Sequence, residues 1–224
     1  MFESIDNYCE RVGSGLLAEP LNAITNLAFI IAALVGWRLA SQMGLRNFQT
    51  ALMTCLLFCI GVGSTLFHTF ATGWAELADI FPIVIFQVTY MWFYCQHVAG
   101  IRGVQALVCL ALFLVILVLG FALPSLGLID DVWLAQLNGS AMYSGAWLGV
   151  LALAIFHFVS DQPKRYTLLL AAAVFSLSLV FRTLDMALCE YLPIGTHFLW
   201  HGCNALVLYL SLSGYLYAVK GKRT

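Results

Sequence analysis

Charged side chains are scarce in this chain of 224 residues, because Asp, Glu, Lys and Arg together make up only 9% of it. Hydrophobic residues reach 62%, whereas soluble domains are about half apolar and about a quarter charged. This composition excludes an ordinary soluble domain and indicates an integral membrane protein. The formal net charge of −1 also argues against a nucleic-acid partner.

The first twenty residues lack the basic start and the apolar core of a cleaved signal peptide, so we expect the first membrane helix to direct insertion. Their acidic residues are Glu3, Asp6, Glu10 and Glu19. The seven cysteines show no Cys-x-x-Cys spacing, which excludes the common zinc-ribbon arrangements. Five of them lie inside apolar runs, where buried thiols are expected, and Cys9 and Cys189 are the exceptions.

Apolar runs of about 20 residues, long enough to cross a bilayer, occur seven times along the chain. They cover residues 21–42, 48–70, 77–97, 103–123, 141–159, 166–188 and 196–218. Polar or helix-breaking residues separate the runs. The sequence therefore predicts an all-α fold, a seven-transmembrane helix bundle. Its parts are an acidic N-terminal segment (1–20), one membrane domain (21–218) and a basic tail (219–224).

Basic residues fall unevenly on the two membrane faces that seven crossings define. Arg11 lies on the face of the N-terminus, and Arg182 lies near the end of the sixth run, toward the same face. The positive-inside rule then places the C-terminus in the cytoplasm and the N-terminus outside. The cytoplasmic face collects eight of the ten basic residues, namely Arg38, Arg46, Arg102, Lys164, Arg165, Lys220, Lys222 and Arg223.

Three histidines meet at one depth near the outer face of this predicted bundle. His68 ends the second run, and His197 and His201 begin the seventh, four residues apart and therefore on one helix face. Ser64 precedes His68 by the same spacing, and Asp79 begins the third run. Ionisable side chains inside a membrane are costly and indicate function. Three imidazoles and a carboxylate are typical of a catalytic zinc site with an open fourth position.

Other ionisable residues of the runs have simpler interpretations. His97 and His157 end the third and fifth runs at the cytoplasmic side, and we interpret them as polar tips that reach the headgroups. Arg182 and Asp185 lie three residues apart in the sixth run, and we expect them to neutralise each other.

The acidic N-terminal segment has two interpretations. Asp6, Asn7, Glu10 and Glu19 offer hard oxygen ligands within a short stretch, an arrangement that suits calcium. A solvated acidic tail is the alternative.

Several motifs, taken together, resemble the alkaline ceramidase family, part of a superfamily of seven-helix membrane hydrolases that includes the adiponectin-receptor-like proteins. The resemblance covers nearly the whole chain. The motifs are Tyr8-Cys9-Glu10, Ala18-Glu19-Pro20-Leu21-Asn22 with Thr25-Asn26, Gly61-Val62-Gly63-Ser64-Thr65-Leu66-Phe67-His68, Asp79-Ile80-Phe81-Pro82 and His197-Phe198-Leu199-Trp200-His201.

The resemblance implies two metal sites and a disulfide. It implies that His68, His197 and His201 hold zinc and that Asp79 and Ser64 complete the catalytic site. It also implies a Cys9–Cys189 bond on the non-cytoplasmic face, where disulfides persist. In the N-terminal segment, Asn7 stands where eukaryotic members tend to have aspartate, and Asp6 is its substitute. The implied calcium ligands are Asp6, Asn7, Tyr8, Glu10 and Glu19.

The resemblance further implies a zinc-dependent intramembrane hydrolase that cleaves ceramide into a sphingoid base and a fatty acid. Asp79 would orient or deprotonate the attacking water, and Ser64 would donate a hydrogen bond to the oxyanion. A receptor-like protein with a structural zinc and a hydrolase of another lipid amide or ester remain as alternatives. A structural zinc needs neither an acid nor an oxyanion donor beside it, which favours the enzyme. The partner is a membrane lipid, reached at the non-cytoplasmic face, and the oligomeric state stays undetermined.

Overall fold

A computed structural model of the chain describes residues 4–127 and 130–222. Glu3 and Arg223 therefore lie outside the described residues. Seven helical spans in the described part are long and apolar enough to cross a membrane, which confirms the predicted all-α bundle. The spans are Pro20–Gln42, Phe48–Phe70, Gly73–Val98, Gly103–Ala122, Ser140–Val159, Thr167–Ala187 and His197–Gly221.

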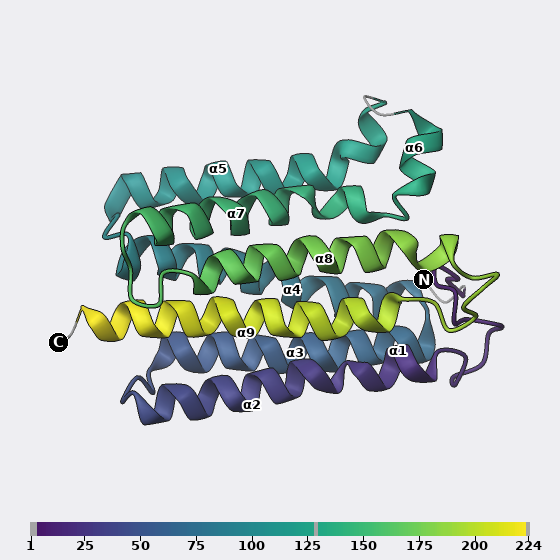
Figure 1. The fold of residues 1–224 in the computed structure, drawn as a ribbon, viewed down its shortest axis with the longest axis horizontal. Helices are drawn as coiled ribbons and strands as arrows, with labels where there is room; N and C mark the ends of the chain where they lie inside the picture. Colours follow the sequence, from purple (N-terminus) through teal and green to yellow (C-terminus); the bar gives the residue numbers. More distant parts are fainter. Residues whose placement is uncertain (1–3, 128–129, 223–224) are drawn as a thin grey trace.

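The helices of the seven spans run side by side along the long axis of the molecule (Figure 1). The short helix α1 and the longer helix α2 together form the first span, and a π-helical turn (Tyr94–Val98) extends α4. The short helix α6 lies between the fourth and fifth spans, flanked by 3-10 turns at Leu123–Leu126 and Ser140–Tyr143. The α-helices are α1 (Pro20–Thr25), α2 (Leu27–Gln42), α3 (Phe48–Phe70), α4 (Gly73–Phe93), α5 (Gly103–Ala122), α6 (Asp131–Gln136), α7 (Ser144–Val159), α8 (Thr167–Ala187) and α9 (His197–Gly221).

The connection between α3 and α4 is shorter than the sequence predicted. Ala71 ends α3 in the left-handed conformation with φ of 44°, Thr72 is extended, and α4 begins at Gly73 rather than at residue 77. Asp79 consequently lies in the second turn of α4 rather than at its start.

Helices α3 and α4 approach closely at Gly63. A Cβ at this position would lie 2.1 Å from the backbone oxygen of Ala78, so only glycine fits there. The close approach places Ser64, the next residue of α3, near the segment of α4 that holds Asp79.

The described basic residues divide between the two ends of the bundle. Arg11 and Arg182 lie at the end where α9 begins, and both are buried, with 5% and 8% of their surfaces exposed. The orientation of the bundle in the membrane stays a prediction. The end that holds the C-terminus (Figure 1) carries the other seven, namely Arg38, Arg46, Arg102, Lys164, Arg165, Lys220 and Lys222.

One expectation about the histidines of that end is wrong. His157 does not reach the headgroups, because its side chain is 0% exposed and its Nδ1 lies 2.7 Å from the hydroxyl oxygen of Tyr94. His97 is half-buried, and its Nδ1 lies 2.9 Å from the hydroxyl oxygen of Tyr215. Each of these two rings contacts a tyrosine hydroxyl of a neighbouring helix.

Candidate metal centre and hydrolytic site

Three buried histidines meet where the end of α3 faces the beginning of α9. His68, His197 and His201 are 1%, 1% and 2% exposed. One ring nitrogen from each lies within 4.8 Å of the other two. Within residues 4–127 and 130–222, no second group of three or more His, Cys, Asp or Glu side chains is arranged to hold a metal ion.

Neighbouring side chains orient two of the three rings. Nδ1 of His68 lies 2.6 Å from Oε2 of Glu19, and Nδ1 of His201 lies 3.0 Å from the hydroxyl oxygen of Thr25. These contacts leave the other ring nitrogen of each free for a metal, while Nδ1 of His197 is buried without a hydrogen-bond partner. Metal-binding histidines are oriented in this way by a second hydrogen bond. Three buried imidazoles with such partners fit Zn²⁺.

The carboxylate of Asp185 holds the beginning of α9. Its Oδ1 accepts hydrogen bonds from the backbone nitrogens of Thr196 and His197, at 2.7 and 2.8 Å, and its Oδ2 accepts one from Cys9 at 3.1 Å. A negative charge at a helix N-terminus is favourable, because the first N–H groups of a helix lack partners within it. Asp185 thereby fixes the position of His197. The expected pairing of Asp185 with Arg182 is wrong, since no ion pair joins them within the described residues.

The connection before α9 requires a glycine. Gly195 has a φ of +62°, and a Cβ added to it would lie 2.1 Å from Oδ1 of Asp185. Only glycine allows Asp185 to reach the first N–H groups of α9.

A cavity leads from this centre into the bundle. Ser64, Asp79, Arg182, His197 and His201 line its polar end, so the structure brings both predicted catalytic residues to the histidines. The cavity follows α9 as far as Ser211, which corresponds to about 20 Å of helix at 1.5 Å per residue. Its remaining walls are largely apolar and include Phe29, Ile60, Phe86, Phe113, Val207 and Leu208.

Arg182 contributes a buried positive charge to the polar end. Its guanidinium lies over the rings of Tyr8, Tyr143 and Trp200, at 5.8, 5.1 and 5.4 Å from their centroids. Nη1 donates to the hydroxyl of Tyr8 at 3.4 Å, and Nε has no hydrogen-bond partner. Aromatic rings hold the cation in place of a carboxylate. The sequence predicted instead that Arg182 pairs with Asp185. The position of Arg182 outside the basic face is the signal that could have indicated its place in the cavity.

An apolar groove borders the cavity on the side of α4, α5 and α7. The cavity and the groove share Ile83, Gln87, Tyr143 and Ala146. The outer part of the groove includes the exposed side chains of Leu114, Val118 and Phe121.

The N-terminal segment is fastened next to the three histidines. A disulfide joins Cys9 to Cys189, with the two Cα atoms 5.4 Å apart. The ring of Tyr8 stacks on His197 with 3.8 Å between the centroids. Burial raises the pKa of Tyr8 well above its usual range, although Arg182 opposes the shift, so the phenol stays neutral.

The acidic residues of this segment use their oxygens within the chain. The two carboxylate oxygens of Glu10 accept hydrogen bonds from the backbone nitrogens of Leu21 and Asn22, at 2.7 and 2.8 Å, at the start of α1. Glu19 accepts hydrogen bonds from Arg11 on Oε1 and from Asn22 on Oε2, the oxygen that also contacts His68.

The hydrogen bonds of Glu19 also keep it ionised. Burial by itself would raise the pKa of Glu19, but the hydrogen bonds with His68, Arg11 and Asn22 outweigh burial and lower it. Asp6 and Asn7 are exposed. Within the described residues, Asp6 forms no group with Glu10 and Glu19 whose carboxylates could hold a metal ion together. The arrangement therefore does not fit the implied calcium ion.

Comparison with models of known protein families matches residues 2–221 to the family described as Ceramidase. A search of curated proteins finds no match. The matched range includes every residue of the centre described above.

Proposed function

We propose that this chain, which belongs to the ceramidase family, is a zinc-dependent intramembrane hydrolase that cleaves ceramide into a sphingoid base and a fatty acid. Membership of the family makes the chain a ceramidase-like hydrolase that acts on an amide bond of a lipid. The buried group of His68, His197 and His201 is the observation that supports zinc.

The residues around the histidines can perform the steps of amide hydrolysis. The three rings would hold a zinc ion, which would supply a Lewis acid and lower the pKa of a water molecule to about 7. Asp79 accepts the proton of the attacking water and returns it to the leaving amine. Ser64 donates a hydrogen bond to the acyl oxygen as negative charge develops there. The positive charge of Arg182, in the same cavity, stabilises that charge as well.

The number of ligands favours a catalytic centre over a structural zinc. Structural zinc sites almost always have four protein ligands, whereas catalytic sites have three and keep one position open. The group in the described part of the chain has three members. Asp79 and Ser64 line the cavity next to that group. There they can act on a water molecule or a substrate at the open coordination position.

The shape of the cavity supports a lipid substrate. Its polar end can receive the amide, and its apolar walls along α9 can receive an acyl chain. The bordering groove between α4 and α5 offers an apolar path from the surrounding lipid. From the distribution of basic residues, we place the polar end toward the non-cytoplasmic face.

Zinc content tests this function most simply. We expect the purified protein to contain about one zinc per chain by elemental mass spectrometry, as three imidazoles predict. We expect His68→Ala and His201→Ala to lose both the metal and lipid hydrolysis. His97→Ala, at the other end of the bundle, is the control and should retain both. Retained hydrolysis in a variant without metal would exclude the mechanism.

A further inference from the structure

The side chain of Arg11 is buried beside the candidate metal centre. Only 5% of its surface is exposed, and buried arginines are rare unless they are paired. It lies two residues after Cys9, whose disulfide with Cys189 fastens this part of the segment.

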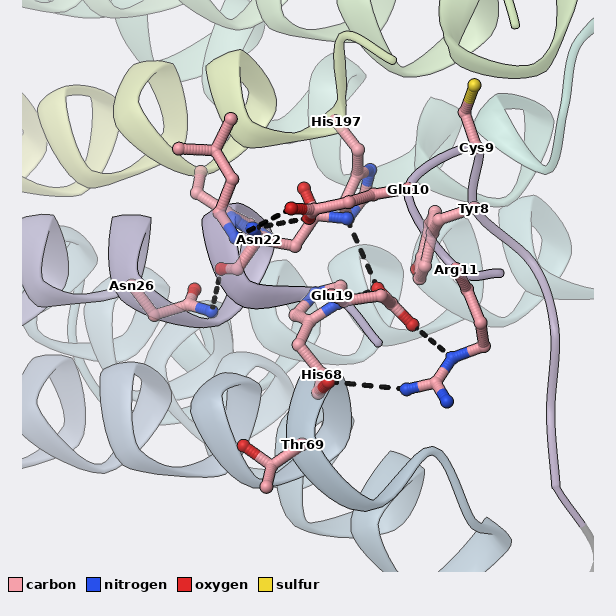
Figure 2. Close-up of polar contacts among 12 residues, drawn as sticks. Tyr8, Cys9, Glu10, Arg11, Glu19, Asn22, Asn26, His68, Thr69 and His197 are labelled. Carbon is pink, nitrogen blue, oxygen red and sulfur yellow. Dashed lines mark hydrogen bonds and ion pairs between the residues drawn. The ribbon is translucent and has the colours of Figure 1, made fainter. Parts of the chain in front are cut away.

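Each guanidinium nitrogen of Arg11 donates to an oxygen of the chain. Nε donates to Oε1 of Glu19, Nη1 donates to the backbone oxygen of Gly13 at 3.1 Å, and Nη2 donates to the backbone oxygen of His68 at 3.3 Å. Figure 2 shows the guanidinium held between Glu19 and His68. One carboxylate and two backbone carbonyls are the oxygen types that calcium takes in proteins.

Two of the three contacts of the Arg11 guanidinium lead to His68. Nη2 holds the backbone oxygen of His68, while Glu19, paired with Arg11, contacts the ring of His68 at Nδ1, at 2.6 Å. Arg11 therefore acts on the backbone of this residue directly and on its ring through Glu19.

We propose that Arg11 is a built-in cation that takes the place of the calcium ion implied for this segment, and that it positions His68 for zinc through Glu19. A calcium ion on Glu19 would have to displace a guanidinium that already occupies Oε1, and the displaced charge would remain buried. The part about His68 rests on the proposed zinc site. The part about calcium does not.

The alternative places calcium elsewhere in the segment. Asp6 and Asn7 are exposed, so a calcium ion could bind them without disturbing Arg11. Glu10 is unsuited as a further ligand of such a calcium ion, since both of its carboxylate oxygens accept hydrogen bonds from the start of α1. The presence or absence of calcium in the unaltered protein decides between the two arrangements.

The first measurement uses the full chain, purified in calcium-free buffer without chelators, because chelators of calcium also remove zinc. Elemental mass spectrometry gives its calcium content, and thermal unfolding is followed with and without added CaCl₂. We expect no bound calcium and no shift of the unfolding temperature. Calcium bound in a one-to-one ratio, or a clear rise of the unfolding temperature with CaCl₂, would overturn the proposal. This measurement needs no variant, so it decides even if the variants fail to fold.

The second measurement compares zinc affinity between variants by competition with a coloured chelator. We expect Arg11→Gln to bind zinc roughly 10–100-fold more weakly, as removal of an outer partner of a metal ligand does. Arg11→Lys keeps the charge without the forked geometry. Its zinc affinity should therefore lie between that of Arg11→Gln and that of the unaltered protein.

Arg165→Gln is the matched control for the zinc measurement. Arg165 pairs with Asp161 at 3.0 Å in an exposed ion pair at the other end of the bundle. We expect its removal to leave zinc affinity unchanged. Equal zinc affinity of Arg11→Gln and the unaltered protein would overturn the positioning role, even if Arg11→Gln unfolds at a lower temperature. If the unaltered protein binds no zinc, the proposed function fails, and the calcium measurement still tests the cation role separately.

Discussion

Oε2 of Glu19 lies 2.6 Å from Nδ1 of His68, so a carboxylate at the start of the first span orients an imidazole at the end of the second. The same carboxylate accepts a hydrogen bond from Arg11 on its other oxygen. A carboxylate on the second nitrogen of a metal-binding histidine fixes the orientation of the ring and raises its basicity as a ligand. Glu19 therefore belongs to the candidate zinc centre as the partner of a ligand.

The contact between Glu19 and His68 predicts the effect of Glu19→Gln. This change removes the negative charge but keeps the shape, so the ring of His68 loses an acceptor and Arg11 loses its counter-charge. We expect zinc affinity to fall roughly 10–100-fold. Competition with a coloured zinc chelator measures the affinity.

Glu10→Gln is the matched control for Glu19→Gln. Glu10 is buried in the same segment but accepts hydrogen bonds only from the start of α1. We expect Glu10→Gln to lower the unfolding temperature and to leave zinc affinity unchanged. A similar loss of zinc in both variants would show that Glu19 acts only through the fold of the segment.

Asp79→Asn should separate catalysis from metal binding. Asp79 lines the cavity beside the histidines but is not one of the three ligands, so the variant should retain its zinc. We expect kcat to fall by roughly 10²–10⁴, the contribution of a general base. Glu76→Gln, one turn earlier on α4, should change kcat little. A variant at Asp79 with unchanged kcat and full zinc content would remove this residue from the mechanism.

Arg182→Met tests the role of the buried positive charge. The guanidinium lies in the cavity with Asp79 and the histidines and has no acidic partner in the described part of the chain. If it stabilises charge on the acyl oxygen, kcat should fall, by up to about 10²-fold, while zinc content stays unchanged. Arg182→Lys should retain part of the activity. Equal activity of Arg182→Met and the unaltered protein would show that Arg182 contributes only to packing and not to catalysis.

Substitutions of two glycines near the start of α9 should differ in their effect on stability. Gly195→Ala places a methyl group 2.1 Å from Oδ1 of Asp185 at a φ of +62°, so we expect a cost of about 1–3 kcal/mol in unfolding free energy, together with weaker zinc binding. Gly202→Ala adds a methyl group inside α9 with no atom within 4 Å, so we expect no loss of stability. Chemical unfolding and zinc competition measure both. Equal stability of the two variants would contradict the role of Asp185 at the helix start.

The helices were predictable from the sequence because length and apolar composition suffice in a membrane. Each span needs about 20 apolar residues, and every predicted run has a corresponding helix. The boundary before α4 was missed because Ala71, rather than a glycine, adopts the left-handed conformation that ends α3. The order of the helices alone also places the three histidines at one depth.

The partners of the polar residues were harder to predict. Spacing along a helix suggested that Asp185 pairs with Arg182, but the N–H groups at the start of α9 bind the same carboxylate. Spacing cannot show such competition, because the competing groups lie at the start of another helix, eleven and twelve residues later. Glu19 was assigned to calcium for the same reason, since the sequence does not show that Arg11 turns inward. A single basic residue in an acidic segment is the signal that could have indicated it.

Hydrolysis by the purified protein tests the central claim most directly. The full chain in lipid nanodiscs is incubated with ceramide, with other N-acyl lipids and with ester lipids, and mass spectrometry identifies the products. We predict that ceramide yields a fatty acid and a sphingoid base, that a zinc chelator stops the reaction, and that added zinc restores it. Ceramide that stays intact, or cleavage that continues at the same rate after zinc is removed, would contradict the account.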